Sequence, residues 1–277
     1  ALNATGQLSW AVGEFEGAIF FYKQSLAISE NAKDQKSASQ VYNNMAMIYS
    51  HLGNYEDALF FYKKVLDVDI ATGDSIGIGL SYNNMGLTYL EQKSFKQSLD
   101  AFAKALTIYR SLNNYDKVAQ TLSNVGLNYA RQNAHAQALT YYEESEKLYQ
   151  KNGLKRGYSI LCTNIGNTYL ALKKYETARA YFEKSLHLSE ELKSKERISE
   201  SLLSLAKLDS TLGNYKHAYQ YFWRYDTLQT SIDRQNHALE LNRFRLQFEI
   251  REKEAENELL RSEASLQAAY LQQQRFI

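Results

Sequence analysis

Small and bulky apolar side chains alternate with polar ones in a pattern that repeats every 40 residues. The register does not slip between the rows that start at Asn43, Asn83, Ser123 and Thr163. In five rows the small residue is Ala46, Gly86, Gly126, Gly166 or Ala206. The aromatic residue three places later is Tyr49, Tyr89, Tyr129 or Tyr169, and Asp209 takes this place in the last row. A period this regular predicts a repeat protein.

Each row predicts two amphipathic helices joined by a short turn, because its apolar residues are spaced by three, four or seven positions. In the second helix, a small and a large column follow the turn: Ala58, Ser98, Ala138, Ala178 and Ala218, then Tyr62, Phe102, Tyr142, Phe182 and Phe222. Residues 13–26 fit this second half, and residues 1–12 are a shortened first half. The chain therefore predicts about six helical hairpins, which must stack because no single hairpin covers both of its apolar faces.

Composition supports an all-α fold, since the 277 residues include no Pro and only 13 Gly, and proline interrupts helices. The 32 basic and 31 acidic side chains nearly cancel, which argues against a nucleic-acid partner. Cys162 is the single cysteine, and no Cys/His cluster has the spacing of a metal site. We therefore expect no cofactor and no bound metal.

The order small residue, Tyr, turn, aromatic, Ala, aromatic resembles the tetratricopeptide repeat (TPR), over roughly residues 1–230. The repeat here is longer than the usual 34 residues and lacks the proline that commonly ends a unit. The resemblance implies a right-handed superhelix of TPR hairpins whose inner groove binds a peptide or protein segment. Versions with 40 residues are similar to those of kinesin light chains, cell-polarity adaptors and bacterial peptide-pheromone receptors. The resemblance to the tetratricopeptide repeat thus implies binding rather than catalysis.

The sequence predicts no catalytic residues. It contains no glycine-rich phosphate loop, no nucleophile elbow and no His-Glu-x-x-His pair. Its histidines are scattered through the chain, at His51, His135, His187, His217 and His237. We therefore predict that this chain is not an enzyme, although a full-length protein could carry a histidine kinase domain elsewhere.

Asparagines recur in the middle of the predicted first helices, at Asn44, Asn84, Asn124 and Asn164, next to Asn43 and Asn83. Asn costs about 0.6 kcal/mol relative to Ala inside a helix, so its return suggests an offsetting hydrogen bond. One interpretation is that these amides bind a peptide backbone in the groove, where each can both donate and accept. The other is that they tie neighbouring helices together in the stack. The sequence leaves both open.

Two further groove candidates lie nearer the ends of the predicted first helices, Asn167 and Arg131. The columns that contain them are mixed and nearly neutral: Met47, Leu87, Leu127, Asn167 and Lys207, then His51, Glu91, Arg131, Ala171 and Thr211. A groove that grips an acidic peptide end would show converging Lys and Arg side chains. We expect no such cluster, and hence either an extended ligand recognised through its backbone or no ligand at all.

Residues 231–277 contain no Gly or Pro and predict one long C-terminal helix. Its first part has closely spaced apolar residues, such as Phe244 and Phe248, that could cover the last hairpin. Further on, a two-stranded coiled-coil seam follows steps of four and three through Ala255, Leu259, Ser262, Leu266 and Ala269. This seam predicts a homodimer, and a solvated helix is the equal alternative.

Repeats followed by a charged helix and a Gln-rich end resemble the extracytoplasmic sensor half of bacterial membrane-bound regulators, including TPR-containing sensor histidine kinases. The resemblance implies a periplasmic or extracytoplasmic module of two-component signal transduction, with a membrane span next to its C-terminal end. Two alternatives remain: a constitutive protein–protein interaction scaffold or adaptor, and a cytoplasmic peptide-pheromone receptor.

Overall fold

A computed structural model describes residues 2–11, 13–32 and 34–233, and every regular element in these ranges is an α-helix. The helices are α1 (Leu2–Ala11), α2 (Phe15–Asn31), α3 (Gln35–His51), α4 (Tyr55–Thr72), α5 (Ser75–Glu91), α6 (Phe95–Ser111), α7 (Tyr115–Arg131), α8 (His135–Asn152), α9 (Lys155–Ala171), α10 (Tyr175–Glu191) and α11 (Lys195–Thr211), and another helix covers residues 215–233. The all-α fold of helical hairpins predicted from the sequence is confirmed.

The small and large columns meet at the centre of each hairpin. A Cβ atom added at Gly86 would lie 2.5 Å from the ring of Phe102, and one added at Gly166 would lie 2.5 Å from the ring of Phe182. Glycine therefore lets the first helix approach an aromatic ring of the second helix more closely than any side chain would allow. This contact explains why the small residue and the aromatic residue return with the same period.

The turn inside each hairpin reverses the chain through one left-handed residue. Gly53 has φ +78°, and in the next rows Lys93 and Asn133 take the same position with φ +61° and +60°. Glycine adopts this conformation without strain, whereas lysine there carries a small cost. Short turns of this kind set the two helices of a hairpin antiparallel.

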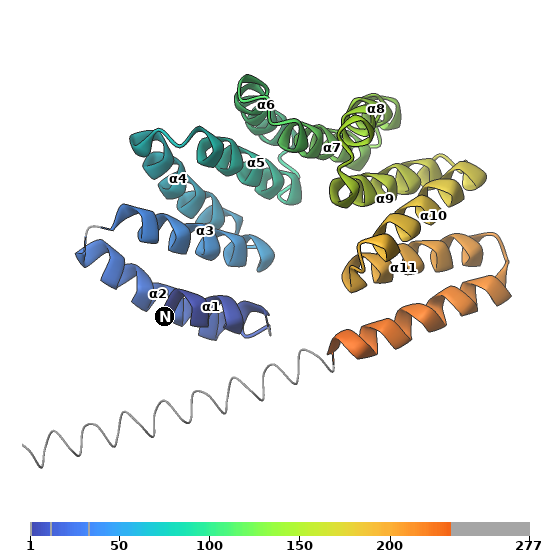
Figure 1. Ribbon diagram of the computed structural model, residues 1–277, viewed down its shortest axis with the longest axis horizontal. Helices are drawn as coiled ribbons and strands as arrows, with labels where there is room; N and C mark the ends of the chain where they lie inside the picture. Colours follow the sequence, from blue (N-terminus) through green and yellow to red (C-terminus); the bar gives the residue numbers. More distant parts are fainter. Residues whose placement is uncertain (1, 12, 33, 234–277) are drawn as a thin grey trace, which may run out of the picture. The chain divides into compact units, whose positions relative to one another are not determined.

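Hairpins stack in chain order, and the first helices form one face of the stack. In Figure 1, α5, α7 and α9 lie on one side, and α6 and α8 lie on the other. Direct packing of α7 on α9 and of α9 on α11 shows that first helices neighbour each other across repeats. We call the exposed side of α3, α5, α7, α9 and α11 the first-helix face.

Aromatic rings fill the space between the two helices of a repeat. Tyr129 stacks on Tyr141 with ring centroids 5.4 Å apart, and Tyr169 stacks on Tyr181 at 5.9 Å. In the last repeat the tyrosine is replaced by Asp209, whose side chain is fully buried. Its carboxylate accepts hydrogen bonds from Arg179, which occupies a position that is leucine in the three preceding rows. Two departures from the repeat pattern thus compensate each other in one ion pair.

The chain divides into two units, residues 1–232 and 233–277. The long C-terminal helix, its coiled-coil seam and the homodimer predicted from it lie outside the described residues. Within the described ranges, no helix combines the length and the apolar character that a bilayer crossing requires.

Candidate functional site

Three amides of the asparagine column connect neighbouring repeats. Each donates from Nδ2 to a side chain 41 positions earlier, on the preceding first helix. The donor–acceptor distances are 2.9 Å from Asn44 to Asn3, 3.0 Å from Asn124 to Asn83 and 3.4 Å from Asn164 to Ser123. These bonds offset the low helix propensity of Asn, so part of the column ties the stack together.

The flanking asparagines have local roles as well. Asn83 is buried, and its Oδ1 accepts hydrogen bonds from Asn124 and from the hydroxyl of Thr121, at 3.0 and 3.3 Å. Asn43 is half-buried, and its Nδ2 lies 3.6 Å from the sulfur of Met47. A buried amide with satisfied hydrogen bonds is a structural residue first, because a ligand would have to break bonds already made.

Asn84 differs from the other members of its column. It is half-buried on α5, and its side-chain amide makes no hydrogen bond to any other described residue. It lines a pocket of about 490 Å³ bounded by Trp10, Met47, Ser50, His51, Tyr55, Tyr62, Leu87, Thr88 and Glu91. We call this the α1/α3/α5 pocket. An amide with free donor and acceptor groups, in a pocket that has both apolar and polar side chains, can bind a peptide backbone while the pocket receives a side chain.

The two remaining candidates do not share this pocket. The guanidinium of Arg131 donates two hydrogen bonds, of 2.9 and 2.8 Å, to the carboxylate of Glu91. Both side chains are about half exposed, and Arg131 therefore bridges α5 and α7 on the first-helix face. Asn167 is exposed on α9.

A second pocket, which we call the α7/α9/α11 pocket, contradicts our expectation that cations do not converge on this face. It has a volume of about 400 Å³ and contains Lys117, Arg156 and Arg197. Its other lining residues are Asp116, Gln120, Ser123, Asn124, Tyr149, Gly157 and Ile160. Column-by-column comparison missed the cluster because Lys117 and Arg197 occupy one column and Arg156 the column before it. Arg156 therefore converges with the other two cations in space although it does not align with them in sequence.

The described part of the chain contains one thiol, that of Cys162, which is buried. No group of three or more His, Cys, Asp or Glu side chains within them is arranged to hold a metal ion. Burial raises the pKa of the Cys162 thiol to about 12, so it stays protonated near neutral pH and is a poor nucleophile. The two pockets of the first-helix face present amide, apolar and charged side chains.

Stacked hairpins with pockets along one face define a helical-repeat protein of the interaction class. A model of the tetratricopeptide repeat matches residues 1–71, 37–111, 77–151 and 159–224. The chain therefore belongs to the tetratricopeptide repeat family, and the family predicted from the sequence is confirmed. No curated protein matches the chain.

Several solved structures share the fold at low sequence identity. BtubC (BKLC) from P. vanneervenii is 15% identical with a TM-score of 0.60, and the match covers 84% of this chain and 92% of that one. A Rap protein complexed with competence and sporulation factor is 14% identical at 0.64, covering 84% and 75%. The Rap conjugation gene regulator of the plasmid pLS20, in complex with the Phr* peptide, is 17% identical at 0.65, covering 74% and 57%.

Proposed function

We propose that the chain binds an extended peptide or protein segment along its first-helix face. The observation that supports this most directly is the α1/α3/α5 pocket, which is lined by the free amide of Asn84 and by the apolar side chains of Met47 and Leu87. Such a site holds a peptide backbone through the amide and an apolar side chain through the pocket. It binds its partner without transforming it, and it needs no cofactor.

We further propose that this binding serves bacterial signal transduction, with the chain acting as the extracytoplasmic sensor module of a membrane-bound regulator. The continuous stack of hairpins supports a sensing role, because each repeat packs on the next and can pass on a change in packing. A change of this kind acts as a switch only if the ligand binds two packing states with different affinity.

A second candidate is a cytoplasmic receptor for a signalling peptide. Its support is the similarity in fold to a Rap protein complexed with competence and sporulation factor and to the pLS20 Rap regulator in complex with the Phr* peptide. A constitutive scaffold would use the same face without switching. All three roles require peptide or protein binding, which is the step to test first.

The test is selection of a displayed library of random dodecapeptides on the full chain. One enriched peptide is synthesised with a fluorescent label, and its affinity is measured by anisotropy. We expect Met47→Glu to weaken binding at least about tenfold, because it puts an unpaired charge where an apolar peptide side chain would be buried. Met47 is 40% exposed, so the change should hardly affect stability.

Phe60→Glu is the matched control. Phe60 is a 53% exposed apolar residue on α4, outside the pocket, and its replacement should leave the affinity unchanged. Failure to enrich any peptide contradicts the proposal. So does an enriched peptide that binds the Met47→Glu variant as tightly as the unaltered chain.

A further inference from the structure

The helix of residues 215–233 has large aromatic side chains on its exposed side. Tyr219 is 65% exposed and Trp223 is 60% exposed, and their ring centroids lie 6.4 Å apart. In the five preceding rows, the position of Trp223 holds an exposed Lys, Ala or Glu: Lys23, Lys63, Ala103, Glu143 and Glu183. A tryptophan at this position is therefore not part of the repeat core, and large aromatic residues are typical of the centre of a protein–protein interface.

The opposite side of this helix fixes it to the stack. Tyr221 and Tyr225 pack against the buried cluster that contains Phe182 of α10. The guanidinium of Arg224 donates a hydrogen bond of 2.9 Å to the carboxylate of Glu190, which also lies on α10. The aromatic side chains are therefore exposed although the helix itself is packed on its neighbours.

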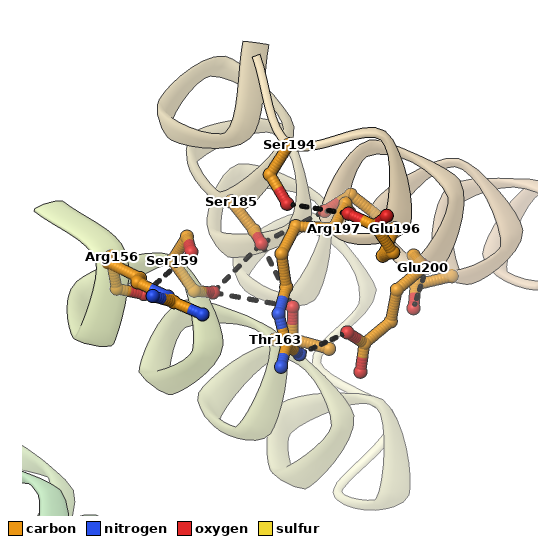
Figure 2. Close-up of polar contacts among 10 residues, drawn as sticks. Arg156, Ser159, Thr163, Ser185, Ser194, Glu196, Arg197 and Glu200 are labelled. Atoms are coloured by element: carbon orange, nitrogen blue, oxygen red, sulfur yellow. Dashed lines mark hydrogen bonds and ion pairs between the residues drawn. The ribbon is translucent and has the colours of Figure 1, made fainter. Parts of the chain in front are cut away.

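The first helix of the last hairpin, α11, is also held by contacts with its neighbours. Figure 2 shows the buried side chain of Ser185 on α10, whose Oγ donates a hydrogen bond of 2.8 Å to the carbonyl oxygen of Ser159 on α9. The same Oγ lies 3.0 Å from the Oγ of Ser201 on α11. Since one buried hydroxyl connects three helices, the last hairpin offers a preformed surface, which lowers the entropy cost of binding.

Two charged side chains lie at the ends of the aromatic pair. Lys216 precedes Tyr219 by three positions, and Asp226 follows Trp223 by three. Both are exposed, and neither forms an ion pair with another described residue. Residues spaced by three and four positions share one face of a helix, and the spacing three, four, three is the same when it is read backwards. We call Lys216, Tyr219, Trp223 and Asp226 the aromatic stripe.

We propose that the aromatic stripe binds the same stripe of a second copy of the chain, with the two helices antiparallel about a two-fold axis at the level of Tyr221. Tyr221 lies midway between Tyr219 and Trp223, and also midway between Lys216 and Asp226. In this register Tyr219 lies opposite Trp223 of the second copy, and Lys216 lies opposite Asp226 of the second copy. Each contact occurs twice, as a two-fold interface requires.

The charges favour a second copy as the partner, because the aromatic stripe is complementary to itself in the antiparallel orientation. A parallel pair would place lysine opposite lysine and aspartate opposite aspartate, and like charges across an interface are unfavourable. The aromatic centre supplies the buried apolar area, and the charges set the direction of the helices. This inference goes beyond the proposed function, since it involves no peptide.

Sedimentation velocity of the full chain over a range of concentrations tests the dimer. We expect a reversible monomer–dimer equilibrium with a dissociation constant in the micromolar range. Trp223→Ala should raise this constant at least about tenfold, because it removes the largest side chain of the aromatic stripe. The melting temperature should change little, since Trp223 is mostly exposed. A chain that stays monomeric up to the millimolar range overturns the proposal.

Charge reversal tests the register. Lys216→Glu and Asp226→Lys should each weaken the dimer about tenfold, because each creates two like-charge contacts across the two-fold axis. A mixture of the two variants should form a heterodimer as tight as the unaltered dimer, since every charge of one stripe then lies opposite an unlike charge of the other. One variant carries a fluorescent label, so that the sedimentation of the heterodimer is followed separately.

Lys96→Glu is the matched control, because Lys96 on α6 is an exposed lysine in the same column as Lys216. Its replacement should leave the dissociation constant unchanged. A dimer that both charge reversals leave intact forms through another part of the chain and overturns the proposal. A mixture of the two variants that associates no more tightly than either variant alone overturns it as well.

Discussion

The α1/α3/α5 pocket and the α7/α9/α11 pocket belong to the same repeated backbone but differ in chemistry. Met47, Leu87 and the free amide of Asn84 line the first, whereas Arg156 and Arg197 line the second. The core columns that build the hairpins barely change between these regions, as the contact of glycine with an aromatic ring shows. The fold is therefore specified by a few repeated positions, and the remaining exposed positions are free to give each part of the face its own specificity.

The core also differs between regions, because only the last repeat has the ion pair of Arg179 and Asp209 in place of leucine and tyrosine. Removing this ion pair should have the largest effect. Arg179→Leu restores the residue of the preceding rows but leaves Asp209 buried without its ion-pair partner. Removing one partner of a buried pair costs about 3–5 kcal/mol, and we expect a loss near the lower end because Arg179 is 23% exposed. Urea unfolding measures this loss as a decrease in the free energy of unfolding. The double variant Arg179→Leu/Asp209→Tyr should recover most of the stability, since it recreates the leucine and tyrosine of the preceding repeat.

The same pair predicts an acid dependence. Burial opposes ionisation of Asp209, but hydrogen bonds from Arg179 and Asn214 outweigh it and lower the pKa of Asp209. A lowered folded-state pKa means that the stabilisation is present above the ordinary aspartate value of about 4 and is lost as the pH falls through the folded-state value. The double variant should lack this contribution. If the stability losses of Arg179→Leu and Asp209→Tyr add up to the loss of the double variant, the two residues are not coupled, which would contradict this explanation.

A smaller effect is expected from the small column, where the repeats also differ. The first complete row has Ala46, whereas the central rows have glycine. A Cβ at Gly126 would overlap the Tyr142 ring and lie 3.1 Å from the carbonyl oxygen of Ala138. Gly126→Ala should therefore destabilise the chain by about 1–3 kcal/mol, despite the better helix propensity of alanine. Thermal unfolding with Ala46→Gly as the reciprocal control measures it, and a stabilised Gly126→Ala variant would refute the close-approach explanation.

Most of the fold follows from the sequence because the residues that pack inside a hairpin repeat in register. Gly126 and Tyr142 occupy aligned columns, and their contact could be predicted from spacing alone. The ion pair of Arg179 and Asp209 could not, because its two residues break different columns 30 positions apart. The cations of the α7/α9/α11 pocket could not be predicted for a related reason, since Arg156 and Arg197 come from neighbouring columns.

The candidate site was predicted only in part, because a column records position and not hydrogen bonding. Asn84 and Asn124 are equivalent in the repeat, yet the amide of Asn124 donates to Asn83 and the amide of Asn84 makes no hydrogen bond within the described part of the chain. The residue 41 positions before Asn84 is also an asparagine, Asn43, but the hydrogen bond of its side chain is local, from Nδ2 to the sulfur of Met47 at 3.6 Å. One column thus has members that tie the stack together and a member that is free for a ligand.

The most direct test of this division compares Asn84→Ala with Asn124→Ala, using the library-selected peptide for affinity and urea unfolding for stability. Both replacements gain the same helix propensity, so we expect Asn124→Ala to be less stable than Asn84→Ala by about 1 kcal/mol, the usual contribution of one hydrogen bond. Asn84→Ala should be at least as stable as the unaltered chain and should lose most of its peptide affinity. Unchanged affinity in Asn84→Ala, or a loss of stability equal to that of Asn124→Ala, would contradict the account.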